Sequence, residues 1–412
     1  MPRPDVALIS PYPPAGSRHA GRSGVASYAG NLAHALGEHG LRVTVVAPTE
    51  PDLPAARERD GPVTVERRFS RGPRAVPTAA RLALATGAPV VHMQHELFLY
   101  GGVGAMPGLL PGLGMLRAAG VGPVVTMHHA IDPAGIDAEF ARMHQVRAPR
   151  HAVRAGLASV QATIGRLARR VIVHEPAFAP LVRDATVVPH GVEGVAPATS
   201  PTGAPTSAPA AGAPGAASPT SSAADGEAES EDDLRLTLLC FGFLAPYKGL
   251  ELALEAASLA REDVRLLVVG GEHPRFAEAG EPFGAALRER WPGIAEFAGY
   301  VPDTELPRWF ARADLALFLY RRPFATSGAL ALAVAHGLPA LLSPTLAELM
   351  GGAPELVAPT AAPALAARLR ALAGDRAALE PLRRRSADLV ADRSWESVAG
   401  RHAEIYGEVS RA

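Results

Sequence analysis

The stretch DVALISPYPPAGSRHAGRSGVASYAGNLAHALGEHGLRVTVVAP, residues 5–48, predicts a complete strand–helix–strand unit. The apolar runs 5–10 and 42–48 are typical of buried strands. Between them Val25, Tyr28 and Leu32 recur at helical spacing, and Gly37 and Gly40 favour a helix end. Such a βαβ unit indicates an α/β architecture.

The same alternation continues through the first half of the chain. Strand-like runs follow at 89–96, 123–130, 170–176 and 185–191, with helical stretches between several of them. We therefore expect a doubly wound parallel sheet, whose ligands bind at the carboxyl ends of its strands.

Residues 195–233 interrupt this pattern, because they consist almost entirely of Pro, Ala, Ser, Thr and Gly with an acidic end. Such a segment buries too little apolar area to offset its ordering entropy, so we predict a disordered linker. It separates an N-terminal Rossmann-like lobe, residues 1–194, from a second lobe, residues 234–392, where strand-like and helical runs alternate again. Residues 393–412 predict an amphipathic helix that needs a surface to pack on.

The composition and charge of the chain argue against several classes of protein. The 412 residues carry a formal net charge of -1, so no basic field draws nucleic acid, which we do not expect as a partner. The sole cysteine, Cys240, lies in an apolar run and fits a reducing cytoplasm. No run of about 18 apolar residues is free of charge and proline, so any membrane contact is expected to be peripheral.

Histidines gather where the predicted strands of the first lobe end. They are His92, His95, His128, His129, His174 and His190. A single one of them is best explained as a hydrogen-bonded structural side chain, but their shared position favours a polar substrate pocket at one sheet edge. No third ligand accompanies a compact pair at metal spacing, so no metal site is predicted.

Lys248 is the only lysine of the chain and stands directly before a predicted helix. A compact ammonium beside a helix N-terminus suits phosphate oxygens. Thr326, Ser327 and Gly328 precede another predicted helix, where hydroxyls and free amides also favour an anion, although a plain helix cap is the better explanation of these three residues taken alone. Two such starts in one lobe indicate a diphosphate. The glycines of the first loop, Gly16, Gly21 and Gly24, are a weaker signal of the same kind.

Six segments, in this order, resemble the retaining glycosyltransferases of the GT-B fold, in particular their fourth family. They are SGVASYAGNLAHALGEHGLRVTVVAP (23–48), VVPHGV (187–192), FGFLAPYKGLELALEAA (241–257), FAGYVPDTELPRWFARADLALFL (297–319), SGALALAVAHGLPALL (327–342) and SWESVAGRHAEIYGEV (394–409). The resemblance implies two Rossmann-like lobes facing a cleft, an acceptor on the first, a nucleotide-sugar donor on the second, and a C-terminal helix that crosses back.

The resemblance also implies roles for single residues. Lys248, with Gly242 before it, matches the lysine that holds the donor diphosphate. Ser327 and Gly328, with Thr326, lie where helix-start amides meet the phosphates, and Gly24 matches the glycine-rich loop near them. His128 matches the histidine that contacts the transferred sugar, so it is the predicted catalytic residue, with His129 as the fallback. His95 and His129 are the predicted acceptor-binding side chains.

Two parts of the family pattern differ in this chain. Phe243 stands where an arginine usually follows the strand glycine, and Ala245 occupies a nearby variant position. The usual pair of glutamates falls on Phe324 and Leu332.

We therefore expect transfer of a hexosyl unit, mannosyl or glucosyl, from a nucleoside-diphosphate sugar to a sugar, lipid-linked or small-molecule hydroxyl acceptor, with retention and without a metal or other cofactor. The alternative is an inactive homologue that binds a nucleotide sugar or a protein partner. The arginines of residues 141–170 are compatible with contact at the inner face of the membrane, although a solvated helix face explains them better.

Overall fold

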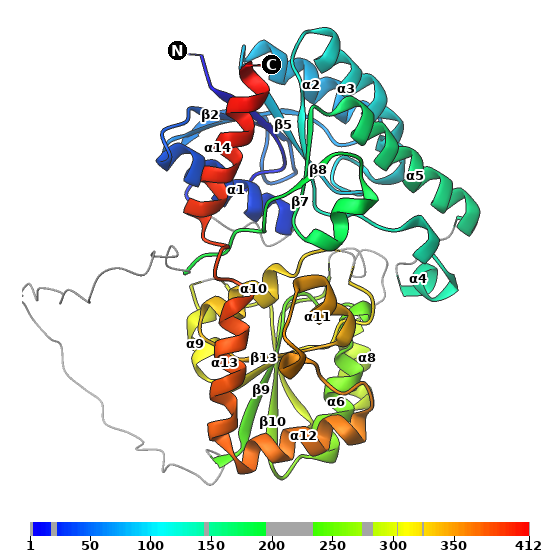
Figure 1. Ribbon diagram of the computed structural model, residues 1–412, viewed down its shortest axis with the longest axis vertical. Helices are drawn as coiled ribbons and strands as arrows, with labels where there is room; N and C mark the ends of the chain where they lie inside the picture. The colour runs from blue at the N-terminus through cyan, green and yellow to red at the C-terminus, as the bar shows by residue number, and fades with distance from the viewer. Residues whose placement is uncertain are drawn as a thin grey trace, which may run out of the picture.

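The computed structural model describes residues 3–17, 23–143, 148–194, 234–273, 283–302, 304–323 and 325–411. The predicted linker, residues 195–233, and Phe324 lie outside these ranges. Two α/β lobes lie one above the other, with the first half of the chain and the last helix in the upper lobe (Figure 1).

The sheet of the N-terminal lobe has eight strands in the order β3-β4-β2-β1-β5-β6-β7-β8. Their bounds are β1 Val6–Ile9, β2 Val43–Pro48, β3 Ala56–Asp60, β4 Val63–Phe69, β5 Val90–His95, β6 Val124–Met127, β7 Arg170–Val173 and β8 Ala185–Val187. All neighbours are parallel except β3, which pairs antiparallel with β4. The register places Val6 of β1 between Val43 and Val90. Strands β5 to β8 are thus consecutive neighbours, with their carboxyl ends at one edge.

Helices cover both faces of this sheet (Figure 1). Their bounds are α1 Gly24–Glu38, α2 Ala75–Ala85, α3 Leu109–Ala118, α4 Ala138–Met143, α5 Arg150–Leu167 and α14 Trp395–Arg411. Helices α2 and α3 pack on the core that contains Ala7 and Ile9 of β1. Helices α1 and α14 cover the core that contains Val6 and Leu8 on the opposite face. The alternation of strand side chains therefore divides the lobe into two apolar layers.

The first helix is defined by local signals at both ends. The Ser23 hydroxyl accepts from the Ala26 amide at 3.4 Å as N-cap. Gly40 adopts φ +92°, a left-handed conformation that ends the helix without a Cβ penalty. Leu32 and Leu36 are fully buried between these ends, which contributes about 1.5–3 kcal/mol each.

The sheet of the C-terminal lobe has five parallel strands in the order β11-β10-β9-β12-β13. Their bounds are β9 Leu236–Phe241, β10 Val264–Val269, β11 Ala295–Gly299, β12 Leu315–Phe318 and β13 Ala340–Leu342. The helices are α6 Leu250–Leu259, α8 Phe283–Arg290, α9 Leu306–Ala311, α10 Gly328–Ala335, α11 Pro344–Met350, α12 Ala362–Gly374 and α13 Leu379–Asp388. After α13 the chain returns to the upper lobe, where α14 packs against α1.

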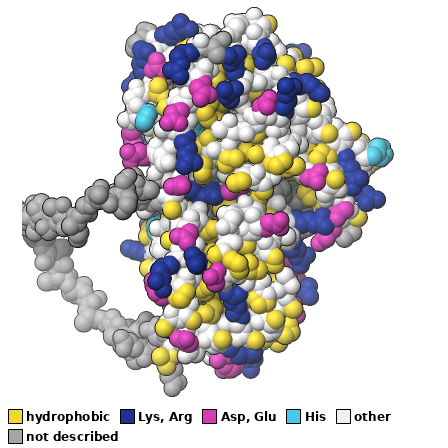
Figure 2. Space-filling view, viewed as in Figure 1, with side chains coloured by type: hydrophobic (Ala, Val, Ile, Leu, Met, Phe, Trp, Pro, Cys, Tyr) yellow, Lys and Arg dark blue, Asp and Glu magenta, His cyan; other side chains and the backbone are white. Residues whose placement is uncertain are grey.

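Strands β3 and β4 were not expected, and β3, which is antiparallel to β4, departs from an all-parallel sheet. Their sequences, ARERD and VTVERRF, are rich in charge, because β3 is an exposed edge strand and only one face of β4 is buried. Acidic and basic side chains are interspersed over both lobes on the face seen in Figure 2. None of the helices described combines the length and the apolar character that crossing a membrane requires.

Candidate functional site

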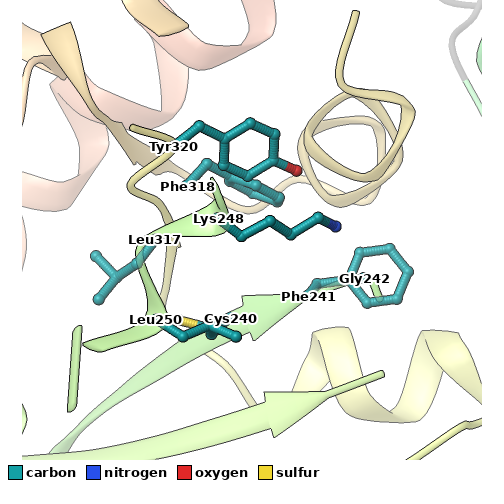
Figure 3. A pocket seen from close by; sticks show the side chains of 8 residues that line it. All are labelled: Cys240, Phe241, Gly242, Lys248, Leu250, Leu317, Phe318 and Tyr320. Carbon is teal, nitrogen blue, oxygen red and sulfur yellow. The ribbon is translucent and has the colours of Figure 1, made fainter. Parts of the chain in front are cut away.

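The lysine expected to hold a diphosphate lies at a meeting point of three segments of the C-terminal lobe. A short 3-10 helix, Pro246–Lys248, follows β9, and Gly249 then starts α6 in a left-handed conformation. A Cβ on Gly242 would lie 2.7 Å from Lys248 Nζ and 3.2 Å from Ala329 Cβ in the first turn of α10. Glycine at 242 therefore leaves room for the ammonium beside the start of α10, as Figure 3 shows for Lys248 and Gly242.

The ammonium of Lys248 lies in a partly apolar setting without a carboxylate. No ion pair joins it to a carboxylate within the described ranges, and its Nζ lies 5.5 Å from the centroid of the Tyr320 ring. Burial lowers the pKa of Lys248 from its usual value. The pocket around it is small, with about 10 Å³ of free volume, which is room for about one water molecule, and it includes Cys240, Phe241 and Leu317 in its lining.

Helix α10 begins beside Gly242 and Lys248. The Ser327 hydroxyl accepts from the Leu330 amide at 3.2 Å as N-cap and contacts the Tyr320 hydroxyl at 3.0 Å. The predicted donor residue Ser327 is therefore the helix cap and is buried. The amides of Gly328 and Ala329 are the first of the helix and have no partner among the described residues. Free amides at the positive end of a helix dipole favour the binding of an anion.

Thr326 and Gly328, at the start of α10, lie against the N-terminal lobe. Thr326 donates from Oγ1 to Glu175 Oε1 in the N-terminal lobe at 3.0 Å, so its hydroxyl faces that lobe. A Cβ on Gly328 would meet His190 Cε1 at 3.5 Å. Gly24 is the first residue of α1, and a Cβ there would meet nothing within 4 Å. Gly21 lies outside the described residues.

Four of the histidines expected at strand ends come together, as their positions predicted. His128, His174 and His190 follow β6, β7 and β8, whereas His92 lies in the middle of β5, opposite Val124 at the start of β6. The Tyr28 ring of α1 lies 4.8 Å from that of His128, 5.0 Å from His174 and 4.9 Å from His190, measured between centroids. From α14, the Tyr406 hydroxyl contacts His92 Nδ1 at 2.7 Å.

Both ring nitrogens of His128 are engaged inside the protein. Nδ1 lies 3.2 Å from His174 Nε2, and Nε2 lies 2.8 Å from the Gln94 side-chain amide. His174 Nδ1 must donate to the Val188 carbonyl at 3.0 Å, so His174 Nε2 accepts and His128 Nδ1 donates. The Gln94 atom placed at His128 Nε2 is Oε1, so with neutral rings the Gln94 amide must be turned over for its NH₂ group to donate to His128 Nε2.

Burial keeps these rings neutral. It lowers the pKa of His92, His128 and His174 well below the usual value, and that of His190 to about 4. Neighbouring imidazoles act in the same direction on His92, His128 and His174. A neutral buried His128 suits a hydrogen-bonding role rather than that of a strong base.

The predicted acceptor residues lie together at the seam between the lobes. Burial lowers the pKa of His95 to about 3, with the nearby His129 as a further cause. The backbone of His129 pairs with Ala325, two residues before the cap of α10. Within the ranges described, no group of three or more His, Cys, Asp or Glu side chains has the arrangement of a metal site.

The sequence analysis missed one feature of this seam. Glu175, directly after His174, forms a buried ion pair with Arg393, and the two Nη–Oε distances are 2.8 and 2.9 Å. The position of Glu175 after a strand was a signal, but its partner is 218 residues away in the sequence.

Comparison with known proteins supports the architecture. The family model of Glycosyltransferase Family 4 matches residues 22–193, so this part of the chain is similar to that family. No curated protein matches the chain.

Solved structures extend the likeness to the whole chain. Sucrose-phosphate synthase from Thermosynechococcus elongatus is 18% identical with a TM-score of 0.67, and each chain is covered to 98%. An α,α-trehalose-phosphate synthase (UDP-forming) from Burkholderia vietnamiensis is 14% identical with a TM-score of 0.63, covering 98% of this chain and 99% of that one. HepE of Anabaena in complex with UDP-glucose is 14% identical with a TM-score of 0.61 and the same coverage. The GT-B fold expected from the sequence is confirmed.

Proposed function

We propose that the chain transfers a hexosyl unit, glucosyl or mannosyl, from a nucleoside-diphosphate sugar to a hydroxyl acceptor with retention of configuration. The observation that carries the proposal is the position of Lys248 Nζ against Gly242 and the first turn of α10, without a carboxylate partner in the described part of the chain. An ammonium about 4 Å from a phosphate oxygen gains roughly 4 kcal/mol at intermediate dielectric before desolvation.

In the proposed reaction the bond between the anomeric carbon and the diphosphate oxygen breaks, and the acceptor oxygen bonds to that carbon on the same face. Negative charge develops on the leaving diphosphate, where Lys248 and the amides of Gly328 and Ala329 stabilise it. The acceptor proton passes to the departing phosphate oxygen. His128 is proposed to orient the transferred sugar through a hydrogen bond, which requires Gln94 to release Nε2.

We propose a uridine nucleotide as the first donor to test. Support comes from the printed names of the solved neighbours, one a UDP-forming synthase and another in complex with UDP-glucose. A thermal-shift screen with UDP-, GDP- and ADP-sugars tests the donor class, because a ligand at 100 times its Kd adds about 2.7 kcal/mol to stability. No stabilisation by any of them would contradict the proposal.

Replacement of Lys248 tests the mechanism. Lys248→Ala should lower kcat/KM for the donor about 10²–10³-fold, since it removes the main charge at the leaving group. Lys248→Arg should lose most activity too, because the larger guanidinium does not fit beside Gly242. Arg261→Ala, at an exposed arginine beyond α6, is the control and should leave activity unchanged. Full activity of Lys248→Ala would remove Lys248 from the mechanism.

The second candidate is a homologue that binds a nucleotide sugar without turnover. It is favoured by Phe243 and Ala245, which leave the anion site without a second cation, and by Leu332, which is packed against the core where the family has a glutamate. This candidate predicts a thermal shift with a nucleotide sugar and no donor hydrolysis or transfer across a panel of acceptors.

The remaining parts of the proposal concern partners and location. We propose a cytoplasmic enzyme that needs no metal, so transfer should survive EDTA. Arg150 and Arg154, at the start of α5, belong to the arginine-rich segment proposed to contact an anionic membrane. Absence of co-sedimentation with anionic liposomes at low salt would exclude that contact.

A further inference from the structure

Glu175, Arg393 and Thr326 form what we call the interlobe cluster. Glu175 follows β7 in the N-terminal lobe, and Arg393 lies between α13 of the C-terminal lobe and α14. The carboxylate and guanidinium form a bidentate pair at 2.8 and 2.9 Å, with side chains only 1% and 8% exposed. Arg393 Nε donates to the Leu389 carbonyl at 2.7 Å, which fixes the guanidinium on the end of α13.

The cluster also holds the start of α10. Thr326 Oγ1 donates to Glu175 Oε1 at 3.0 Å, and Thr326 directly precedes the N-cap Ser327. One carboxylate of the N-terminal lobe therefore binds two separate segments of the other lobe. One is the segment where the chain returns to the upper lobe, and the other is the helix start that carries the proposed phosphate amides.

Open space beside these hydrogen bonds makes them important for the relative position of the two lobes. A hollow of about 430 Å³ lies beside the pair and is lined from both lobes, among others by Pro176, Met350 and Asp388. Side chains do not fill the seam there. A buried ion pair adds little net stability compared with an apolar pair, but its directional geometry specifies one arrangement.

We propose that Glu175 is a positioning residue that sets the approach of the two lobes and the placement of α10 during sugar transfer. Its catalytic consequence rests on the proposed function. The diphosphate site of Lys248, Gly242 and α10 lies within the C-terminal lobe, so donor affinity does not need the cluster. Turnover does, because it requires the N-terminal lobe to be held against the bound donor.

Thr326→Val tests the coupling to α10 without leaving a buried charge unpaired. We expect the Kd for UDP to stay within twofold of wild type, and kcat for hydrolysis of UDP-glucose to fall about tenfold, as for loss of a hydrogen bond to a charged group. Thr326→Ser keeps the hydroxyl and should restore kcat. A higher Kd with unchanged kcat would make Thr326 a donor-binding residue instead and overturn the proposal.

Glu175→Gln tests the geometry of the lobes by small-angle scattering without any ligand. It leaves the buried guanidinium without its counter-charge, so we expect the lobes to separate and the radius of gyration to exceed that of wild type. Asp137→Asn is the matched control. Asp137 pairs with Arg322 across the same seam at 2.7 Å, but both side chains are more than a third exposed, so its loss should not change the radius.

The outcomes separate this inference from the proposed function. If wild type neither binds UDP nor hydrolyses UDP-glucose, the proposed function fails, while scattering of Glu175→Gln still decides the geometric role. If Glu175→Gln does not fold, kcat of Thr326→Val decides. An unchanged radius for folded Glu175→Gln, or full activity of Thr326→Val, overturns the inference.

Discussion

Gly249 and Gly351 have nearly the same backbone conformation but different surroundings. Both adopt φ +69°, with ψ of 28° and 30°. A Cβ on Gly249 would lie 2.0 Å from the Leu319 carbonyl oxygen, whereas one on Gly351 would meet nothing within 4 Å. A comparison of the two positions therefore separates the free-energy cost of a left-handed backbone from that of a steric clash. Gly249 directly follows Lys248, the proposed diphosphate anchor.

Alanine at each position measures these two costs. Gly351→Ala should lower the free energy of unfolding by about 1–2 kcal/mol, the penalty of the left-handed region alone. Gly249→Ala should lose clearly more, because the Leu319 strand end or the turn before α6 must move. Urea denaturation of both variants against wild type gives the comparison. Equal losses would show that the turn at 249 adapts freely.

Single residues were predictable from the sequence where a local motif carries them. Lys248 and Ser327 each precede a helix start, and both lie at the proposed anion site. Glu175 was not singled out, because its importance arises from Arg393, which no local pattern connects to it. His128 was assigned a contact with the sugar, and the structure adds that Gln94 and His174 occupy both of its nitrogens.

The ends of strands β5 to β8 and helix α14 together enclose neutral histidines, which makes stability depend on pH. Burial lowers the pKa of His402 in α14 to about 4, and its Nε2 has no hydrogen-bond partner in the part of the chain described. Below about pH 6.5 the unfolded chain binds a proton that the folded His402 does not. Stability is therefore full above pH 6.5 and is lost as the pH falls towards 4.

His402→Leu should reduce this pH dependence. Removing one such group lowers the slope of unfolding free energy against pH by about 1.4 kcal/mol per unit between pH 4 and 6.5. Trp395→Phe changes the same packed region without removing a titratable group, so it should lower stability equally at every pH. Urea titrations at pH 5 and 7 measure both. An unchanged slope for His402→Leu would mean that the imidazole is hydrated in the folded state.

Most elements were predictable because apolar periodicity marks buried faces. The strands around β1, β5 and β9 are nearly all apolar and were expected. Strands β3 and β4 were not, since they are rich in charge and Arg67 even lies on the buried face of β4. Arg67 can be buried there, because Glu58 and the carbonyls of Tyr12 and Pro13 accept its hydrogen bonds. Strands β3 and β4 therefore join the sheet through contacts with distant residues rather than through a local sequence pattern.

The two-lobed molecule followed from the repeated alternation of strands and helices, but the position of α14 did not. Its periodicity predicts an amphipathic helix and is silent on which lobe receives it; only the family resemblance indicated the N-terminal lobe. The structure packs Val398, Ile405, Tyr406 and Val409 into the apolar layer formed with α1. The N-terminal lobe thus takes part of its core from the other end of the chain.

This shared core predicts how the lobe behaves when it is divided. The four buried side chains of α14 contribute about 1.5–3 kcal/mol each, a sum of roughly 6–12 kcal/mol that is comparable with the whole stability of a domain. A fragment of residues 1–194 should therefore lack cooperative unfolding, and the same fragment fused to residues 393–412 should regain it, as followed by circular dichroism. A fusion with Ile405→Asp and Val409→Asp is the control and should remain unfolded, because it buries two unpaired carboxylates. If residues 1–194 unfold cooperatively alone, the N-terminal lobe does not need α14 for its stability. The return of the chain to this lobe would then serve to fix the relative position of the two lobes, together with the ion pair of Arg393.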